Sequence, residues 1–179
     1  MEIERKWMVD GWPEESVPDA SLVLQYTEMQ EQGYLHATVP IVRIRREERA
    51  GASEDGTLPE VKYVLCFKSA GRLARQEIEL EIPVEKYQEL KEMIGRPLIG
   101  KVRRAYALPD GHTLEVNLVD QGLPSQFWYA EVEFDSIGSA RSWDPAVAGL
   151  GTYLDDDVTE QPGQSMSAYW LATRGGMQE

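Results

Sequence analysis

Charged and apolar residues alternate with a period of two in eight short segments of the chain. Successive side chains of a β-strand point to opposite faces, so this alternation predicts strands rather than helices. The predicted strands cover residues 2–9, 21–30, 38–48, 60–69, 75–83, 101–108, 112–120 and 128–136. Turn residues separate them at 51–60 and 69–72, and the Asp110–Gly111 pair is a strong hairpin signal.

Few helices are expected. Residues 84–94 carry apolar side chains at helical spacing, and Gly95 follows as a suitable C-cap. Shorter helices are predicted near residue 139 and from Ser165 to Gly175, and residues 155–157 are expected to form a solvated acidic turn. Eight mainly antiparallel strands with few helices predict a mainly β (α+β) fold in a single domain, residues 1–179. Either a closed barrel or a sandwich would fit this pattern.

The charges of the predicted strands gather on one face of each strand and segregate by sign. The basic pairs are Arg43 with Arg45 and Lys101 with Arg103, and the acidic pairs are Glu2 with Glu4, Glu77 with Glu79 and Glu131 with Glu133. Like charges two residues apart on a strand face add nothing to stability. A polyanion between the cations and a metal ion between the carboxylates would explain them. An amphipathic sheet with its charged face in water is the alternative, because antiparallel sheets commonly keep one wet face.

Composition narrows the classes of partner. The 179 residues carry a net charge of −13 and a mean hydropathy of −0.43, and they contain one cysteine. The charge argues against affinity for nucleic acid or anionic membranes, although a locally basic cavity could still hold a small anion. Cys66 alone can form neither an intramolecular disulfide nor a cysteine-based zinc site, so a cytoplasmic location is expected. Because it alternates with Leu65 and Phe67, Cys66 is predicted to be inert packing.

The order of the charged motifs resembles the CYTH superfamily, the triphosphate tunnel metalloenzymes. The motifs are Glu-x-Glu-x-Lys at 2–6, Arg-x-Arg at 43–45, Lys68 in "CFKS", "RQEIE" at 75–79, "KVRRAY" at 101–106, "LEVN" at 114–117 and "AEVEF" at 130–134. The similarity extends from Glu2 to about Trp170, and "LQYTEMQ" resembles the short bacterial branch with its Gln-x-Tyr strand. This resemblance implies an eight-stranded antiparallel closed β-barrel with a polar tunnel and a few peripheral helices.

The resemblance also implies roles for the charged residues. The triphosphate would be bound by Lys6, Arg43, Arg45, Lys68, Arg75, Lys101 and Arg103. The ligands of Mg²⁺ or Mn²⁺ would be Glu2, Glu4, Glu77, Glu79, Glu115, Glu131 and Glu133. Lys6 and Lys68 would neutralise the scissile phosphate and its leaving group, and a metal ion near Glu4 would activate the attacking water. Asn117 stands where the family usually has Asp, which removes one negative charge from the expected metal region.

The implied activity is metal-dependent hydrolysis of a triphosphate by in-line attack of water. Inorganic tripolyphosphate is the expected substrate, because no aromatic pair on the charged faces would hold a base. The alternatives are hydrolysis of nucleoside or thiamine triphosphate, adenylyl cyclisation of the class IV type, and polyphosphate binding without turnover. A small-molecule triphosphate is thus the expected partner, and the chain is expected to act as a monomer or homodimer.

Overall fold

The computed structural model describes residues 1–50 and 59–175. The strands are β1 (Glu2–Val9), β2 (Val23–His36), β3 (Ile41–Ala50), β4 (Glu60–Lys68), β5 (Ala74–Arg75), β6 (Glu77–Glu81), β7 (Ile99–Ala107), β8 (Thr113–Val119), β9 (Phe127–Glu133) and β10 (Asp156–Asp157). The helices are α1 (Pro13–Ser16), α2 (Val84–Ile94), α3 (Ile137–Ser142), the 3₁₀ helix η1 (Pro145–Ala148) and α4 (Met166–Arg174). None of the helices in the described residues is long and apolar enough to cross a membrane.

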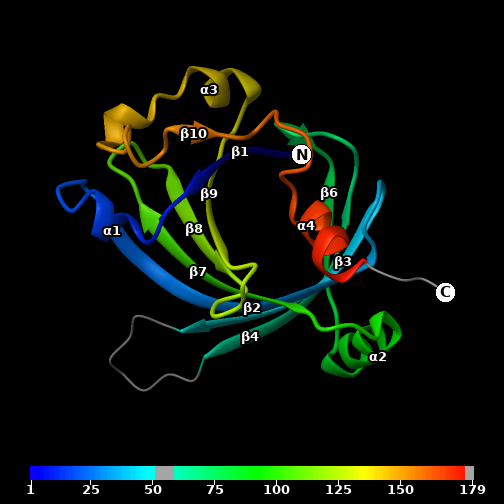
Figure 1. Ribbon diagram of the computed structural model, residues 1–179. Coiled ribbons are helices and arrows are strands. Elements are labelled where there is room, and N and C mark those ends of the chain that lie inside the picture. Colours follow the sequence, from blue (N-terminus) through cyan, green and yellow to red (C-terminus); the bar gives the residue numbers. More distant parts are fainter. Residues whose placement is uncertain (51–58, 176–179) are drawn as a thin grey trace.

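The strands form one antiparallel sheet that curves into a nearly closed barrel (Figure 1). Its order is β10-β1-β9-β8-β7-β2-β3-β4-β6. The short strand β5 pairs with β1 through Glu2–Arg75 and Ile3–Ala74, and so connects the β6 end of the sheet to its β1 end. The predicted mainly β barrel with peripheral helices is therefore confirmed.

All eight predicted segments contain a strand, but several boundaries differ. The fifth segment divides at Gln76, whose carbonyl accepts a hydrogen bond from the Ser69 amide, so β5 pairs with β1 and β6 with β4. Strand β2 continues past residue 30 to His36. Two of the residues predicted as an acidic turn instead form β10, which pairs Asp157 with Trp7 of β1. Of the turn predicted at residues 51–60, residues 51–58 lie outside the described residues.

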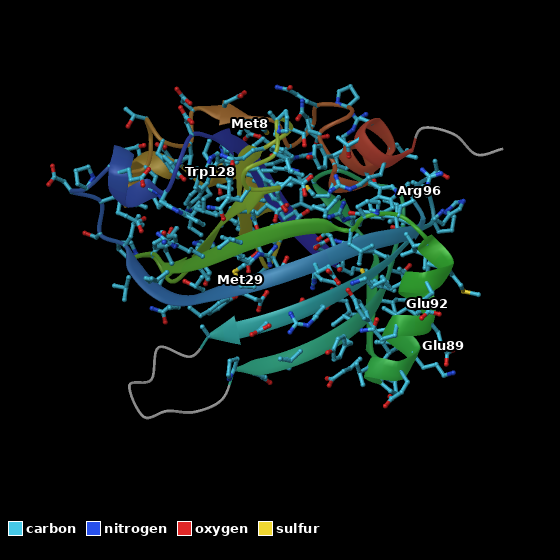
Figure 2. The ribbon with its side chains drawn as sticks, turned by 60° about the horizontal axis from the view of Figure 1, so that its bottom comes forward. Met8, Met29, Glu89, Glu92, Arg96 and Trp128 are labelled. Atoms are coloured by element: carbon cyan, nitrogen blue, oxygen red, sulfur yellow. The ribbon has the colours of Figure 1, made fainter. Side chains whose placement is uncertain are left out.

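Helix α2 follows its sequence pattern closely. It ends at Gly95, whose positive φ of 60° suits glycine and whose amide donates to the Lys91 carbonyl. Tyr87 is buried against Tyr63 of β4, so the helix covers part of the outer face of the barrel. Glu89 and Glu92 lie on its exposed side (Figure 2).

The larger apolar core lies outside the barrel, not within it. It covers the outer faces of β1, β7, β8 and β9, where Trp7, Leu114 and Val132 are fully buried beneath α3 and η1. The outer faces of β4 and β6 are less covered: Phe67, Ile78 and Leu80 are 36%, 49% and 49% exposed. Met29, on the outer face of β2, is also exposed (Figure 2).

A second apolar cluster lies where α4 packs against the inner face of the sheet. Its buried members are Tyr34, Ile99, Val119, Tyr129, Met166 and Trp170. Asp120 holds the helix in place by accepting hydrogen bonds from the Arg174 guanidinium at 2.8 and 3.0 Å and from Tyr169 Oη at 2.6 Å. The interior is therefore apolar beside α4 and charged beyond it.

Candidate active site

A cavity of about 800 Å³ lies inside the barrel. All fourteen charged residues singled out from the sequence line it, namely Glu2, Glu4, Lys6, Arg43, Arg45, Lys68, Arg75, Glu77, Glu79, Lys101, Arg103, Glu115, Glu131 and Glu133. They come together because period-two alternation puts each of them on the inner face of its strand. With Arg72, eight basic and seven acidic side chains of the described residues line the cavity.

Carboxylates face one another across β1, β9 and β8. Glu4 lies opposite Glu133, and Glu115 lies opposite Glu131. Like charges in directly opposed positions destabilise a sheet unless a cation separates them. Burial, together with Glu131 and Glu2, raises the pKa of Glu4 to about 8. Burial and the neighbouring carboxylates likewise raise the pKa of Glu133.

Two cations contact the carboxylates near the start of β1. Arg75 donates to Glu2 and to Glu4, each at 2.6 Å. The Lys68 ammonium lies 3.2 Å from both Glu2 and Glu77. Lys68 therefore bridges the acidic residues of β1 and β6, whereas Arg75, among the described residues, contacts only those of β1.

The two arginines of β3 approach the carboxylates of β6 in the same way. Arg45 donates to Glu79 at 3.2 Å, and the Arg43 guanidinium lies 3.5 Å from Glu79 and 3.7 Å from Glu77. Both arginines are buried. Their Nε atoms have no hydrogen-bond partner among the described residues, so each retains a donor for another acceptor.

Arg103 of β7 contacts a carboxylate and an amide. It lies 2.8 Å from Glu115, and its Nε donates to Asn117 Oδ1 at 2.9 Å. Asn117 is fully buried and is absent from the residues lining the cavity. Asn117, which stands where the family usually has Asp, is therefore set back from the cavity, and its oxygen is already bound to Arg103.

Lys6 and Lys101 meet at one tyrosine that the sequence analysis did not select. The Lys6 ammonium lies 4.1 Å from the centre of the Tyr129 ring and donates to the Gln164 carbonyl at 2.6 Å. The Lys101 ammonium donates to Tyr129 Oη at 2.9 Å. Burial lowers the pKa of both lysines. Tyr129 is two residues before Glu131, so the alternation that identified Glu131 could also have found it.

Strand β2 supplies further polar residues, some of them beyond its predicted end at residue 30. Glu28, Gln30 and Gln32 are buried on its inner face, and Gln32 Nε2 donates to Tyr34 Oη at 3.0 Å. Tyr34 lines the cavity. The Gln-x-Tyr spacing therefore occurs at Gln32–Tyr34, beyond the stretch in which the sequence analysis placed it.

Cys66 also faces inward, contrary to the prediction of apolar packing. It lies opposite Arg43, and its thiol donates to Glu77 at 3.1 Å. Burial raises the pKa of the thiol to about 11, which keeps it protonated at neutral pH. The expected low reactivity therefore has a different cause: burial beside a carboxylate.

The acidic residues fit a hard divalent cation. Five carboxylates from β1, β8 and β9 supply oxygen donors of the kind that Mg²⁺ and Mn²⁺ prefer, namely those of Glu2, Glu4, Glu115, Glu131 and Glu133. Because burial, Glu131 and Glu2 raise the pKa of Glu4 despite the contact with Arg75, a cation bound there would favour its anionic form. In a separate group, ligand atoms of Cys66, Glu77 and Glu79 lie within 4.8 Å of one another. The oxygen-rich set suits the hard cation better, because a thiol favours softer metals.

Comparisons with known proteins agree with this geometry. No protein-family model matches the chain. An inorganic triphosphatase of Nitrosomonas europaea is 30% identical over 159 residues, which cover 89% of each protein. A crystal structure of an inorganic triphosphatase aligns with a TM-score of 0.55 at 27% identity, covering 94% of this chain and 93% of that one. A Hippeastrum protein with a dominant triphosphatase activity shares the fold, with a TM-score of 0.56 at 17% identity over 86% and 88% of the two chains.

Proposed function

This chain belongs to the inorganic triphosphatase family of the CYTH superfamily, and we propose that it hydrolyses inorganic tripolyphosphate in the charged cavity. The observation that carries the proposal is the lining of that cavity, in which basic and acidic side chains occur in nearly equal number and contact one another. Phosphate oxygens can replace the carboxylates around the basic groups, while a divalent cation takes up the carboxylates. A metal triphosphate would thus satisfy both sets of charges.

The basic residues would bind and orient the phosphate chain. Arg43 and Arg45 offer planar guanidinium groups, which suit phosphate because they can donate two parallel hydrogen bonds. Lys6 and Lys68 would neutralise the charge that develops on the transferred phosphoryl group and on the leaving pyrophosphate. Water attacks the terminal phosphorus, the anhydride bond to the leaving oxygen breaks, and orthophosphate and pyrophosphate are released.

The acidic residues would bind the metal ion. Glu2, Glu4 and Glu133 would hold it with oxygen ligands, with Glu115 and Glu131 nearby on β8 and β9. Mg²⁺ or Mn²⁺ bound there would supply Lewis acidity and lower the pKa of a bound water. The lone Cys66 favours a reducing compartment, so we place the reaction in the cytoplasm.

The cavity favours an inorganic substrate. Two tyrosines line it, but neither ring is free to stack on a base: Tyr34 packs on Trp170 with ring centres 5.6 Å apart, and Tyr129 lies against the Lys6 ammonium. Organic triphosphates would therefore gain little from their organic part. We expect a higher kcat/KM for tripolyphosphate than for ATP or thiamine triphosphate.

Phosphate release from these three substrates tests the proposal, measured with Mg²⁺, with Mn²⁺ and with EDTA. The expected result is turnover of tripolyphosphate that requires a divalent cation. Equal or faster turnover of ATP, or formation of cyclic AMP, would overturn the substrate assignment. Tight binding of tripolyphosphate without turnover would instead identify a binding module.

A further inference from the structure

Tyr129 forms the boundary between the charged cavity and the apolar cluster beneath α4. It belongs to β9, is 1% exposed, and lines the cavity while packing within the cluster that contains Val119 and Met166. Phe127 stacks near its ring, with centres 6.0 Å apart. A side chain wedged in this way has little freedom to rotate, so its hydroxyl and ring face are fixed in position.

Both groups contact a lysine ammonium. Lys6 comes from β1 and lies over the ring face, 4.1 Å from its centre, whereas Lys101 comes from β7 and donates to Oη at 2.9 Å. A ring face attracts a cation through its quadrupole, and this attraction grows when the pair is shielded from water. In the sheet, β9 and β8 lie between β1 and β7. One rigid side chain on β9 thus contacts a cation from each of these two flanking strands.

Lys101 depends on this contact more than Lys6 does. Lys6 has a second partner, the Gln164 carbonyl, whereas Lys101 donates to Tyr129 Oη and to no other acceptor within residues 1–50 and 59–175. The Lys101 side chain is 4% exposed, so water cannot easily replace the hydroxyl. A buried ammonium without an acceptor is strongly disfavoured and would move or lose its charge.

We propose that Tyr129 is a positioning residue that holds the Lys6 and Lys101 ammonium groups at the spacing needed to bind and hydrolyse tripolyphosphate. This inference rests on the proposed function. The two contacts have separate consequences. The hydroxyl serves Lys101 and therefore binding, whereas the ring serves Lys6, which would also stabilise the transition state.

Two substitutions separate these contacts. Tyr129→Phe keeps the ring and removes the hydroxyl, so tripolyphosphate should bind about tenfold more weakly while kcat changes by less than about threefold. Tyr129→Leu removes the ring as well, so kcat should also fall by about tenfold or more. Affinity is measured by calorimetry with tripolyphosphate in EDTA, and kcat and KM by phosphate release with Mg²⁺.

Tyr153→Phe is the matched control. Tyr153 is also buried and donates its hydroxyl to the Gly11 carbonyl at 2.8 Å, but it lies in the outer core. This variant should lower the melting temperature without changing affinity, KM or kcat. If Tyr129→Phe behaves like Tyr153→Phe, Tyr129 is only structural and the inference is wrong.

A double-mutant cycle with Lys101→Met tests the route of the effect. If Tyr129 acts through Lys101, Tyr129→Phe should weaken tripolyphosphate binding in the wild type but hardly at all in Lys101→Met. Additive losses would overturn the inference. Because the calorimetry needs no turnover, it still tests Tyr129 if the wild type binds tripolyphosphate without hydrolysing it, whereas that same result would refute the proposed function.

Discussion

The two sides of the barrel differ in what supports them from outside. Strands β1, β7, β8 and β9 are backed by the larger apolar core, whereas β4 and β6 expose much of their outer apolar surface. The carboxylates proposed to hold the metal ion or to lie beside it are on the backed side, and Arg43, Arg45 and Lys68 lie on β3 and β4. A metal ion needs ligands within a few tenths of an ångström of their places, while long basic side chains can follow a flexible polyanion.

Side-chain contacts reinforce the backed side. Arg5, on the outer face of β1, donates to the carbonyls of Ala140 and Trp143 and to Asp157 of β10. These bonds connect the strand that carries Glu2 and Glu4 to α3 and to the segment that leads to α4. We therefore expect changes to the carboxylates on the backed side to affect kcat most, changes to its outer core to affect stability, and changes to Arg43, Arg45 and Lys68 to affect substrate affinity.

The largest effect is expected for Glu4→Gln. The amide keeps the size of the side chain but removes the charge of a metal ligand, so kcat should fall by about a thousandfold. Tripolyphosphate should still raise the melting temperature, because the basic residues are unchanged. Phosphate release and thermal melting measure the two effects. Glu89→Gln, on the exposed side of α2, is the control and should change neither. Full activity of Glu4→Gln would remove Glu4 from the metal site.

Leu114→Ala and Leu80→Ala compare the two outer faces directly. Leu114 is fully buried in the outer core of β8, and Leu80 of β6 is 49% exposed. The first should lower the free energy of unfolding by about 2–5 kcal/mol, and the second by less than about 1 kcal/mol. Urea denaturation measures both. Equal losses would mean that the β6 side is covered in solution.

Arg45→Ala should mainly affect substrate binding. Its buried guanidinium offers a charge-assisted contact to a phosphate, so kcat/KM should fall by the equivalent of about 2–4 kcal/mol, with most of the change in KM. Arg46→Ala is the control, because the neighbouring side chain points outward and pairs with Glu48. If the two variants have the same kinetics, Arg45 does not bind substrate.

Acid should loosen the attachment of α4. Although burial opposes ionisation, hydrogen bonds from Arg174 and Tyr169 hold the pKa of Asp120 below its usual value of 3.8. A lowered pKa stabilises the folded state above about pH 4, and this contribution is lost as the pH falls through the folded-state pKa. Asp120→Asn should therefore be less stable at pH 7, by about 1–3 kcal/mol, with a smaller loss below pH 4. The free energy of unfolding of both proteins is measured from pH 7 to pH 3. A difference between wild type and Asp120→Asn that stays the same over this range would contradict this assignment.

Asn117→Asp should have the smallest effect on catalysis. Because Asn117 Oδ1 already accepts from Arg103, a carboxylate there would strengthen that contact instead of adding a metal ligand. The metal concentration for half-maximal activity should change by less than about threefold. A much lower requirement would place position 117 in the coordination shell after all.

The alternation of residues specified the faces of the strands but not which face lies inside. Glu131 and Val132 necessarily point in opposite directions, yet an inward Val132 would have made an equally regular barrel or sandwich. The ordered motifs resolved this choice by resemblance. The remaining features, such as the division at Gln76 and the extension of β2 to His36, depend on the pairing of strands distant in the sequence. No local sequence pattern indicates that pairing. Tyr129 was missed because a buried aromatic residue next to a strand end looks like ordinary core.

The cavity lining carries eight basic and seven acidic side chains, so the net charge of −13 comes from the rest of the chain, most of it on the outer surface. At an ionic strength of about 0.01 M the screening length is about 30 Å, so an incoming polyanion is repelled before it reaches the barrel. Added salt shortens the distance over which the outer surface repels the polyanion. The contacts between basic side chains and phosphate inside the cavity are screened less. Capture of tripolyphosphate should therefore accelerate as moderate salt is added, the reverse of the behaviour of proteins that attract polyanions to a basic exterior.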